Sequence, residues 1–403
     1  MNKKLICLGA LAAISEIAHA QSSVTMYGIL DEAFEAVSNV KTSAGHGRPV
    51  YQLNGSSGLN GTRWGLRGSE DLGGSLHAIF LLENGFDVGT GKLNQGGDLF
   101  GRQAYVGLQS DAYGTVTLGR QYDSVVDMVG PFGVGEQWGS NRSAHAGDID
   151  NLNDTYRVNN AIKYQTRNYA GLKAEALYSL GGVAGSISRN QIASVGVSYA
   201  NGPVSVGAAY LNVRNPNISF FGNNSTSGGV TTNNIGATNP IYGGYASAHT
   251  YQVAAAGAAY AFGAATVGMT YSNIQFRGLG DTAESGPDAA GWTGNAVFNN
   301  VEVNFKYQFT PTLLAGVAYD FTRNGGATST EAGINGSGAR YNQFSLGVDY
   351  FLSKRTDIYA LGAYQIASGY DSTGAAATSQ LGSLSGSGNS RQAVLRTGIR
   401  LRF

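Results

Sequence analysis

The chain has 403 residues, and 26 lysines and arginines balance 26 aspartates and glutamates, so the formal net charge is zero. Charged residues make up only 13% of the sequence, about half the share of an ordinary soluble domain. These values argue against a typical cytosolic enzyme, and the lack of a basic excess argues against a nucleic-acid partner.

The N-terminal segment predicts export. Two lysines precede an apolar run over residues 5–14, and Ala18 and Ala20 form an A-x-A cleavage site. This layout is typical of a signal peptide, which we expect over residues 1–20; the alternative is a buried N-terminal helix. Cys7, the one cysteine of the sequence, lies inside the predicted signal peptide. The mature chain therefore has to be stable without disulfides.

Beyond residue 20 the recurring pattern is a period of two over ten or more residues, which predicts β-strands with one apolar face. In residues 301–309, valines and aromatics alternate with Glu302, Asn304 and Lys306, and residues 395–403 alternate in the same way. No later segment has 18 consecutive apolar residues, so spanning helices are excluded. The segments are longer than the five or six residues usual in soluble sandwiches. Their length suits a tilted transmembrane strand of about 9–11 residues.

Sixteen such segments are predicted, joined by connections that alternate between short and long. They begin near residues 23, 57, 74, 98, 113, 156, 170, 190, 203, 248, 264, 296, 312, 339, 356 and 389. Short connections include 111–113 and 201–203, and the long ones at 215–247 and 369–388 are rich in glycine, serine and asparagine. Short turns on one rim and long loops on the other are typical of outer-membrane barrels. In lipid every backbone polar group must be paired, so such a sheet has to close on itself.

Aromatic residues near the strand ends predict the interfacial girdles of such a barrel. The set comprises Tyr27, Tyr105, Tyr164, Tyr178, Tyr199, Tyr210, Tyr260, Tyr271, Tyr307, Phe309, Tyr350 and Phe351. The alternative is that tyrosines favour strands in general.

Several segments carry a resemblance to a known family. They are residues 23–31 (SVTMYGILD), 62–74 (TRWGLRGSEDLGG), 100–108 (FGRQAYVGL), 114–121 (GTVTLGRQ) and the C-terminal 400–403 (RLRF). In these segments the chain resembles the general trimeric porins of Gram-negative bacteria, in the branch of the neisserial and Burkholderia-type porins. The resemblance covers essentially the whole mature chain and is weakest in the long loops.

The resemblance implies an all-β fold, a 16-stranded antiparallel transmembrane β-barrel over residues 21–403. It implies short periplasmic turns, long extracellular loops and a third loop, about 122–155, that folds inward and narrows the channel. It also implies a homotrimer in the cell outer membrane, in contact with lipid and lipopolysaccharide. The terminal Phe403 is typical of barrels that the barrel-assembly machinery recognises.

Pleat parity and the family pattern together predict a basic wall in the pore constriction. Arg63 and Arg67 alternate with Trp64 and Leu66. An arginine that faces hydrocarbon at mid-bilayer costs about 2–4 kcal/mol, so we expect the arginines to face the lumen. Arg120 shares the parity of apolar neighbours, and its placement would need a bend in the strand. The predicted wall consists of Arg63, Arg67, Arg102, Arg157 and Lys163; in the resembling porins the positions matching Arg63, Arg102 and Arg157 form a basic cluster.

The third long connection is predicted to supply acidic groups that face this wall. It contains six acidic residues, and its segment Gly130-Pro-Phe-Gly133 resembles the tip of an inward-folded loop. The acids expected at the pore are Asp123, Asp127 and Glu136. The alternative is that they are ordinary solvated loop charges.

The sequence does not favour catalysis. The histidines of the mature chain are scattered without metal-ligand spacing, and no G-x-S-x-G nucleophile motif is present. We therefore expect no enzyme activity, no metal and no cofactor. His145 near Ser143 is the one pair that a barrel enzyme would use, and a loop histidine is more often incidental.

The sequence predicts a general diffusion porin for ions and small hydrophilic solutes. Counting five wall cations against three loop acids predicts a weak anion preference, since the lining charges of a narrow pore dominate its field. One alternative is a substrate-specific channel of the same fold; a sugar-specific one would line its lumen with aromatics. The other is a non-channel, β-rich surface adhesin, which would need long repeats.

Overall fold

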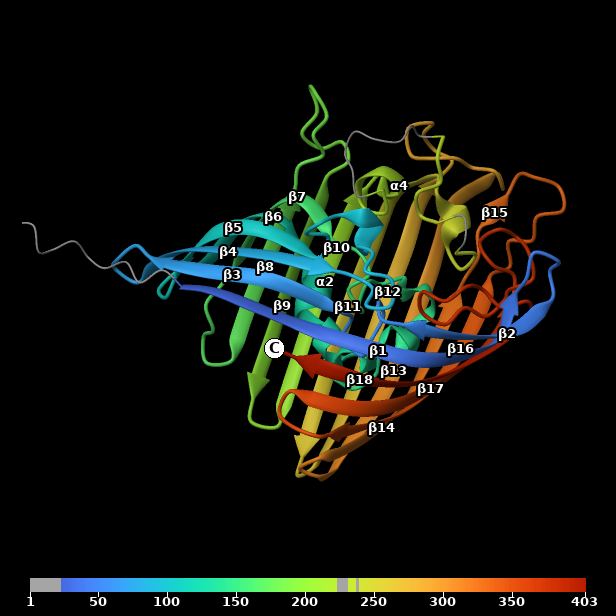
Figure 1. The fold of residues 1–403 in the computed structure, drawn as a ribbon. Helices are drawn as coiled ribbons and strands as arrows, with labels where there is room; N and C mark the ends of the chain where they lie inside the picture. Colours follow the sequence, from blue (N-terminus) through green and yellow to red (C-terminus); the bar gives the residue numbers. More distant parts are fainter. Residues whose placement is uncertain (1–22, 223–230, 237–238) are drawn as a thin grey trace, which may run out of the picture.

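The computed structural model describes residues 23–222, 231–236 and 239–403, and in this part the chain forms one antiparallel sheet that closes on itself (Figure 1). The predicted signal peptide, residues 1–20, lies outside the described residues. Among the described helices, none combines the length and the apolar character needed to cross a membrane.

The sheet contains 18 strand segments. They are β1 (Ser23–Lys41), β2 (Gly47–Asn54), β3 (Arg63–Asp71), β4 (Leu76–Gly85), β5 (Gln103–Ser110), β6 (Gly114–Gln121), β7 (Val158–Gln165), β8 (Leu172–Ser179), β9 (Ile192–Asn201), β10 (Val204–Arg214), β11 (Ala248–Phe262), β12 (Ala265–Leu279), β13 (Trp292–Thr310), β14 (Leu313–Asn324), β15 (Thr328–Ser329), β16 (Ala339–Phe351), β17 (Thr356–Gly369) and β18 (Arg391–Arg402). Short helical turns occur only in the connections of the described chain: η1 (Gln95–Gly97), α2 (Ser124–Met128), η2 (Gly130–Phe132), α3 (Val134–Gln137), η3 (Asn141–Ser143), η4 (Ala146–Asp148), α4 (Pro216–Ser219) and η5 (Gly243–Tyr245).

Two features reduce these segments to the 16 strands of a barrel. β1 pairs with β3 along residues 23–29 and with β2 along residues 33–41, so β2 and β3 are two parts of one strand. β15 pairs with the start of β13, while β14 pairs directly with β16. The barrel closes between β1 and β18, in a register that runs from Ile29 opposite Arg402 to Val37 opposite Val394. The predicted 16-stranded antiparallel barrel is confirmed.

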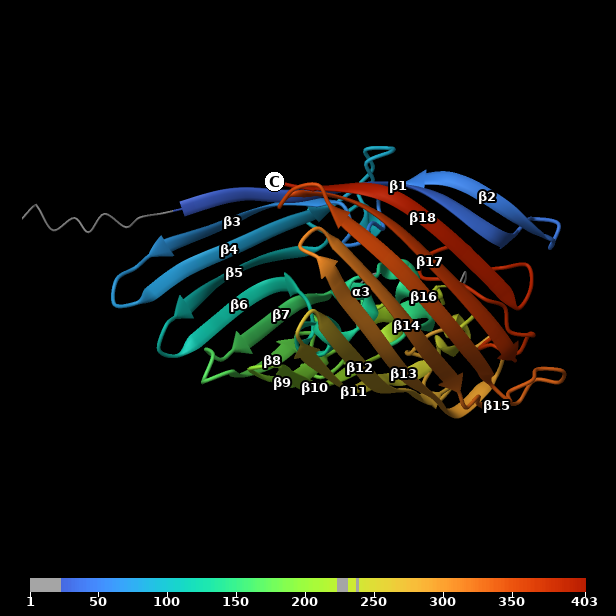
Figure 2. The same cartoon turned by 90° about the horizontal axis from the view of Figure 1, so that it is seen from below.

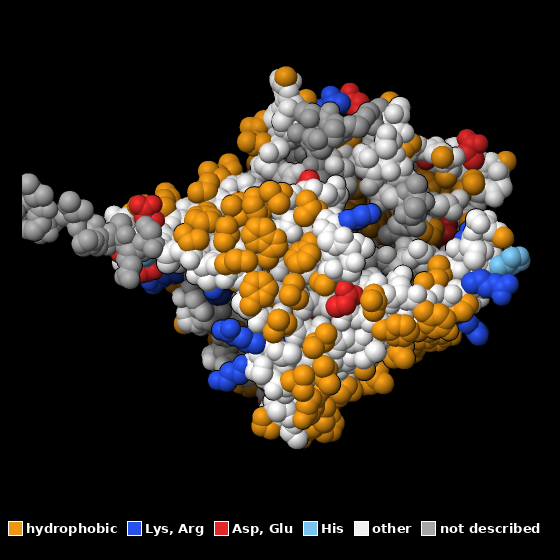
Figure 3. Space-filling model, in the orientation of Figure 1, with side chains coloured by type: hydrophobic (Ala, Val, Ile, Leu, Met, Phe, Trp, Pro, Cys, Tyr) orange, Lys and Arg blue, Asp and Glu red, His pale blue; other side chains and the backbone are white. Residues whose placement is uncertain are grey.

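The outer surface of the barrel is apolar because every second side chain of the strands points outward (Figure 3). Val106 of β5 is 57% exposed, Leu346 of β16 59% and Leu395 of β18 58%. Inward-pointing neighbours such as Gln343 and Arg396 are buried and polar. A continuous exposed apolar belt of this kind is stable against hydrocarbon rather than water.

Aromatic side chains stand beside the short turns, as the girdle pattern predicts. Tyr260 and Phe262 at the end of β11 are exposed, and Phe309 at the end of β13 is 60% exposed. The girdle interpretation is wrong for Tyr27 and Tyr105, because the pleat places both on the inner face. Tyr27 donates a hydrogen bond to Glu83 (2.8 Å), and Tyr105 lines a cavity inside the barrel.

The long loops fold back over one side of the lumen. Phe221, Tyr242 and Tyr245 of the connection between β10 and β11 pack against inward-facing aromatics of β11 and β12, with centroid distances of 5.4 Å for Phe221–Tyr251 and 5.7 Å for Tyr245–Phe276. All five rings are 8% exposed or less. This side of the extracellular half is therefore filled, and the open path is displaced toward β1 and β18.

Candidate pore constriction

The connection between β6 and β7, residues 122–157, lies inside the barrel (Figure 2). We call it the constriction loop. Its first helix, α2, lies against β8, β9 and β10, where glycines of the wall leave room for it. A Cβ added to Gly196 of β9 would lie 2.8 Å from the Met128 side chain of α2, and one added to Gly257 of β11 would lie 2.6 Å from Phe132 of the following turn, η2. Glycine inside a strand commonly marks such a close approach of another segment.

The loop continues across the lumen to β14 and β16, where the Trp138 indole packs flat on two further glycines. A Cβ on Gly316 would lie 2.4 Å from the indole ring carbons, and a Cβ on Gly347 would lie 2.9 Å from them. The loop thus follows a path of wall positions that carry no side chain, and its height in the barrel depends on those glycines.

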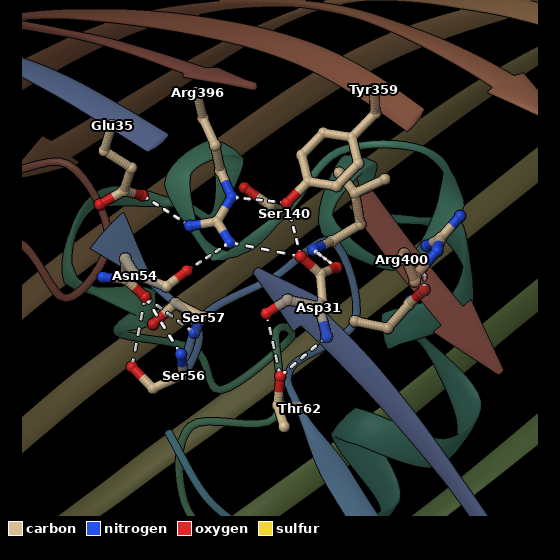
Figure 4. A network of polar contacts seen from close by, with 12 residues as sticks. Asp31, Glu35, Asn54, Ser56, Ser57, Thr62, Ser140, Tyr359, Arg396 and Arg400 are labelled. Carbon is tan, nitrogen blue, oxygen red and sulfur yellow. Dashed lines mark hydrogen bonds and ion pairs between the residues drawn. The ribbon is translucent and has the colours of Figure 1, made fainter. Parts of the chain in front are cut away.

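Beyond Trp138 the loop is fixed to β1 by a buried ion pair. Arg142 donates through Nε and Nη2 to the two carboxylate oxygens of Glu35, at 2.8 and 3.1 Å. Glu35 also accepts a hydrogen bond from Arg396 of β18 (2.7 Å), and Arg396 contacts Asp31 and Tyr359 (Figure 4). Both Glu35 and Arg396 are 0% exposed. Every charged group of this network has an opposite charge in contact, which is the condition under which buried ions are tolerated.

A second buried attachment centres on His145. Its Nδ1 lies 2.6 Å from Asp150 of the same loop, and its Nε2 lies 3.3 Å from Glu302 of β13 and 3.5 Å from Asp320 of β14. Burial alone would lower the pKa of His145, but Asp150 and Asp320 outweigh burial and raise the pKa well above its ordinary value. His145 is therefore a structural cation that ties the loop to the wall. Glu302 adds to the attachment by accepting a hydrogen bond from the Val134 backbone N–H (2.8 Å).

Arg102 and Arg157 of the predicted basic wall meet at one phenol. Their Nη2 atoms donate to the Tyr122 hydroxyl at 2.8 and 3.1 Å, and each also contacts Asp154, at 3.0 and 3.3 Å. Arg102 makes a further ion pair with Glu83 of β4 (2.8 Å). Burial would raise the pKa of Asp154, but the two guanidinium groups outweigh it and hold the pKa below its ordinary value.

The other predicted wall residues lie at different places in the lumen. Arg63 stands near the two arginines, with its Nε 3.8 Å from Glu83. Arg67, nearer the short-turn rim, lies over the ring of Tyr27 at 5.5 Å from its centroid. Lys163 is beneath the loop, where it forms ion pairs with Asp127 and, at 3.4 Å, with Glu175.

The opposite side of the opening is a segment that sequence reasoning missed. Residues 55–62, between β2 and β3, leave the wall and turn into the lumen; we call them the inward segment. Leu59 fixes it by donating its backbone N–H to Asp31 (2.8 Å). A cavity of about 160 Å³ separates the inward segment from the constriction loop, and its lining includes Ser56, Ser57, Asn60, Arg102, Glu136 and Arg157.

The predicted loop acids differ in position. Glu136 on α3 lines the cavity and is exposed to the lumen. Although Glu136 faces the lumen, the surrounding barrel removes much of the water around its carboxyl group. This desolvation, together with the negative charge of Asp154, raises the pKa of Glu136 to about 7. Asp127 forms an ion pair with Lys163. Asp123 is 0% exposed and caps α2, accepting from the Val125 backbone N–H (2.8 Å), so it does not line the cavity.

Three acids that pair with the wall cations were not among those predicted to face the pore: Glu83, Asp154 and Glu175. Glu83 follows the apolar run of β4, and Glu175 alternates with apolar residues of β8, so pleat parity alone would have placed both in the lumen. Asp154 is one of several loop acids, and nothing in the sequence distinguishes it from Asp148 or Asp150.

Arg120 lies close enough to this cluster to interact electrostatically with Arg157 and Tyr122. The register between β6 and β7 shifts between Gly119 and Gln121, and Asn160 of β7 has a positive φ of 51°. At this bulge Arg120 donates to the Gly101 carbonyl (2.8 Å) and to Asn159. The sequence indicated that placing Arg120 would need a bend in its strand. The structure has an irregularity at this point, but the extra residue belongs to β7 rather than to β6.

Comparison with known proteins places this geometry in a family. The model of the Gram-negative porin family matches residues 8–370. An outer membrane porin of Bordetella pertussis is 32% identical over 393 residues, covering 90% of this chain and 94% of that protein. An anion-selective porin from Comamonas acidovorans superimposes with a TM-score of 0.69 at 24% identity, covering 95% of this chain and 100% of that one. The trimer form of OmpT from Vibrio cholerae gives a TM-score of 0.60 at 15% identity over 95% of this chain.

A closed 16-stranded barrel, an apolar outer belt and an inward-folded third loop thus coincide with a family match that spans most of the sequence. The chain belongs to the Gram-negative porin family and is an outer-membrane diffusion porin.

Proposed function

We propose that this porin passes ions and small hydrophilic solutes with a weak preference for anions, and that it acts as a channel and not as an enzyme. The observation that carries the proposal is the cavity of about 160 Å³ between the inward segment and the constriction loop. Arg102 and Arg157 line one part of it together with the acidic residues Glu136 and Asp154, and serine and asparagine side chains line much of the remainder. Such a polar opening favours hydrated solutes without a specific fit.

The preference should be weak because the lumenal charges nearly cancel. The five wall cations are Arg63, Arg67, Arg102, Arg157 and Lys163, and the five acids beside them are Glu83, Asp127, Glu136, Asp154 and Glu175. Lys306 adds a positive charge beneath the loop, and in the described chain no carboxylate lies within 4.0 Å of it. These groups therefore contribute six positive charges and five negative charges, a slight excess of positive charge.

The reversal potential of the purified protein in a planar bilayer tests this proposal. In a salt gradient it should have the sign of anion selectivity at neutral pH. The selectivity should fade toward 1 M salt, where the Debye length falls to about 3 Å from about 30 Å at 0.01 M. A protein that opens no channels, or a cation preference at neutral pH, would contradict the proposal.

We also propose a homotrimer, surrounded by outer-membrane lipid and lipopolysaccharide. The exposed apolar belt supports contact with lipid, and one of the solved relatives is described as a trimer form. Phe403 is 44% exposed at the end of the last strand, where the assembly machinery could bind it. Native mass spectrometry in detergent should give the mass of three chains, and a spectrum of monomers alone would contradict the trimer.

A further inference from the structure

A second cavity, of about 240 Å³, lies on the short-turn side of the constriction loop. Leu314 at the start of β14, Phe351 at the end of β16 and Arg402 at the end of β18 contribute to its lining. Asn60 and Glu136 line both this cavity and the one in the constriction. A solute that passes the constriction therefore enters the second cavity next.

The lining of this second cavity divides into an apolar part and a charged part. Leu314, Phe351 and Trp138 provide the apolar part. The charged part contains two cations and two carboxyl groups: Arg400, Arg402, Glu136 and Asp349. Their sum is zero, so the cavity does not select for net charge, but it presents both signs of charge beside an apolar surface.

The cationic side of the cavity has capacity for a carboxylate. The Arg400 guanidinium already donates hydrogen bonds to Asp357, to Asp349 (3.0 Å) and to Asn60. The Arg402 side chain is 35% exposed, and the one hydrogen bond that it makes through a side-chain nitrogen within the described residues joins Nη1 to Asp357 (2.8 Å). Because a guanidinium has five N–H donors, Arg402 can still bind an anionic group.

The anionic side of the cavity has similar capacity. Glu136 is exposed to the lumen, and in the described structure no cation lies within 4.0 Å of it. Asp349 accepts from Arg400 through Oδ2, while its Oδ1 has no hydrogen-bond partner in the part of the chain that is described. The indole N–H of Trp138 likewise has none. A buried polar group without a partner costs about 1–3 kcal/mol, so a solute that pairs with it is favoured.

We propose that this cavity is a binding site for small zwitterions with an apolar side chain, of which apolar and aromatic α-amino acids are the chemical class. The carboxylate of the solute binds Arg402, its ammonium group faces Glu136 and Asp349, and its side chain lies against Phe351, Leu314 and Trp138. The volume is below the roughly 300–1,000 Å³ typical of sites for drug-sized ligands, which limits the occupant to a small molecule. The proposal rests on the diffusion-porin function and deepens it by naming a preferred class of solute.

Four probe molecules distinguish the contributions of the carboxylate, the ammonium group and the apolar side chain to binding. The purified protein is held in a planar bilayer, and each probe is added on the short-turn side. L-Phenylalanine carries all three groups, 3-phenylpropanoate lacks the ammonium, phenethylamine lacks the carboxylate, and glycine lacks the apolar side chain. The readout is the concentration that halves the single-channel current or saturates the current noise. Phenylalanine should act at a concentration at least about fivefold lower than each of the other three, a difference of about 1 kcal/mol.

Two variants and a matched control connect this preference to the cavity. Arg402→Gln removes the free guanidinium and should raise the phenylalanine concentration at least fivefold. Lys354→Gln removes an exposed cation from the neighbouring turn, outside the cavity, and should leave it unchanged. Phe351→Ala tests the apolar part independently if the Arg402 variant does not assemble, and it should reduce the advantage of phenylalanine over glycine.

Each result supports or overturns the proposal. Equal effects of the four probes, or equal behaviour of the Arg402 and Lys354 variants, would show that the cavity holds only water. Normal conductance with no selective block by phenylalanine overturns this inference but leaves the diffusion function standing. The absence of any conductance contradicts the diffusion function itself.

Discussion

Arg142 of the constriction loop and Glu35 of β1 form a two-fold hydrogen-bonded ion pair, with distances of 2.8 and 3.1 Å, and both side chains are 1% exposed or less. At this contact Glu35 of the wall neutralises the charge that Arg142 brings from the loop. The pair therefore fixes where the loop ends its path across the lumen, and through that position it sets the width of the opening.

Arg142→Gln should loosen the loop. Removal of one partner from a buried ion pair costs about 3–5 kcal/mol, because the other charge stays buried. We expect a larger and noisier single-channel conductance and a lower temperature for the heat-dependent shift of the barrel band in gel electrophoresis. Arg189→Gln is the matched control, because Arg189 pairs with Glu284 on the exposed surface, where a pair contributes about 0–1 kcal/mol. If both variants behave like the parent, Arg142 does not hold the loop.

Neutralising Arg63, Arg102 and Arg157 together should shift the selectivity toward cations and widen the pore. Glu83 and Asp154 would keep their charges without the guanidinium groups that now contact them. Reversal potentials in a potassium chloride gradient measure the shift, which should be largest at low salt. Arg167→Gln, in an exposed turn, provides the control. Unchanged selectivity in the triple variant would mean that these arginines do not determine the field of the pore.

The selectivity should depend on pH near neutrality through Glu136. The pKa of this group is raised to about 7, so the carboxyl group is neutral at pH 6 and ionised at pH 8. The anion preference should therefore be stronger at pH 6 and weaker at pH 8. A raised carboxyl pKa also means that the fold favours the protonated form, so the contribution of Glu136 to stability is present at low pH and is lost as the pH rises through 7.

Glu136→Gln should remove this pH dependence and keep the stronger anion preference at both values. Glu331→Gln, on an exposed loop, should leave the pH dependence as it is. A pH profile of the Glu136 variant that matches the parent would assign the titration to another group.

Gly316→Ala should displace the constriction loop without changing any charge. The new methyl group would lie 2.4 Å from the Trp138 indole, and overpacking of this kind costs about 1–3 kcal/mol. The single-channel conductance should change by more than the spread between recordings, and the heat-modified gel band should appear at a lower temperature. Gly386→Ala, where a Cβ would meet nothing within 4 Å, is the control. If the two alanine variants conduct alike, the position of the Trp138 indole does not depend on the lack of a side chain at Gly316.

Much of the barrel could be predicted because a strand exposed to lipid on one face and water on the other has to alternate. The same rule placed Arg63 and Arg102 in the lumen. It could not place the inward segment, because Gly55 to Gly58 is as compatible with the start of a strand as with a break. The second strand was expected to begin near residue 57, whereas it begins at Gly47 with β2, is interrupted by the inward segment and resumes at Arg63 with β3.

The pairing of charges could not be predicted, since it depends on which loop acid reaches which strand. Asp123 is an exception, because an aspartate directly before an apolar run is a typical helix N-cap. That signal was present in the sequence and identifies Asp123 as a structural residue. Asp154, by contrast, reaches Arg102 from a position 52 residues away along the chain.

Glu35 accepts hydrogen bonds from two segments far apart in the sequence, Arg142 of the constriction loop and Arg396 of the last strand. Arg396 can reach it only when β18 has paired with β1, because these strands close the barrel. The attachment of the loop is therefore complete only in a finished cylinder. A chain in which β1 and β18 have not paired lacks a set aperture, so the permeability of the pore depends on closure of the barrel.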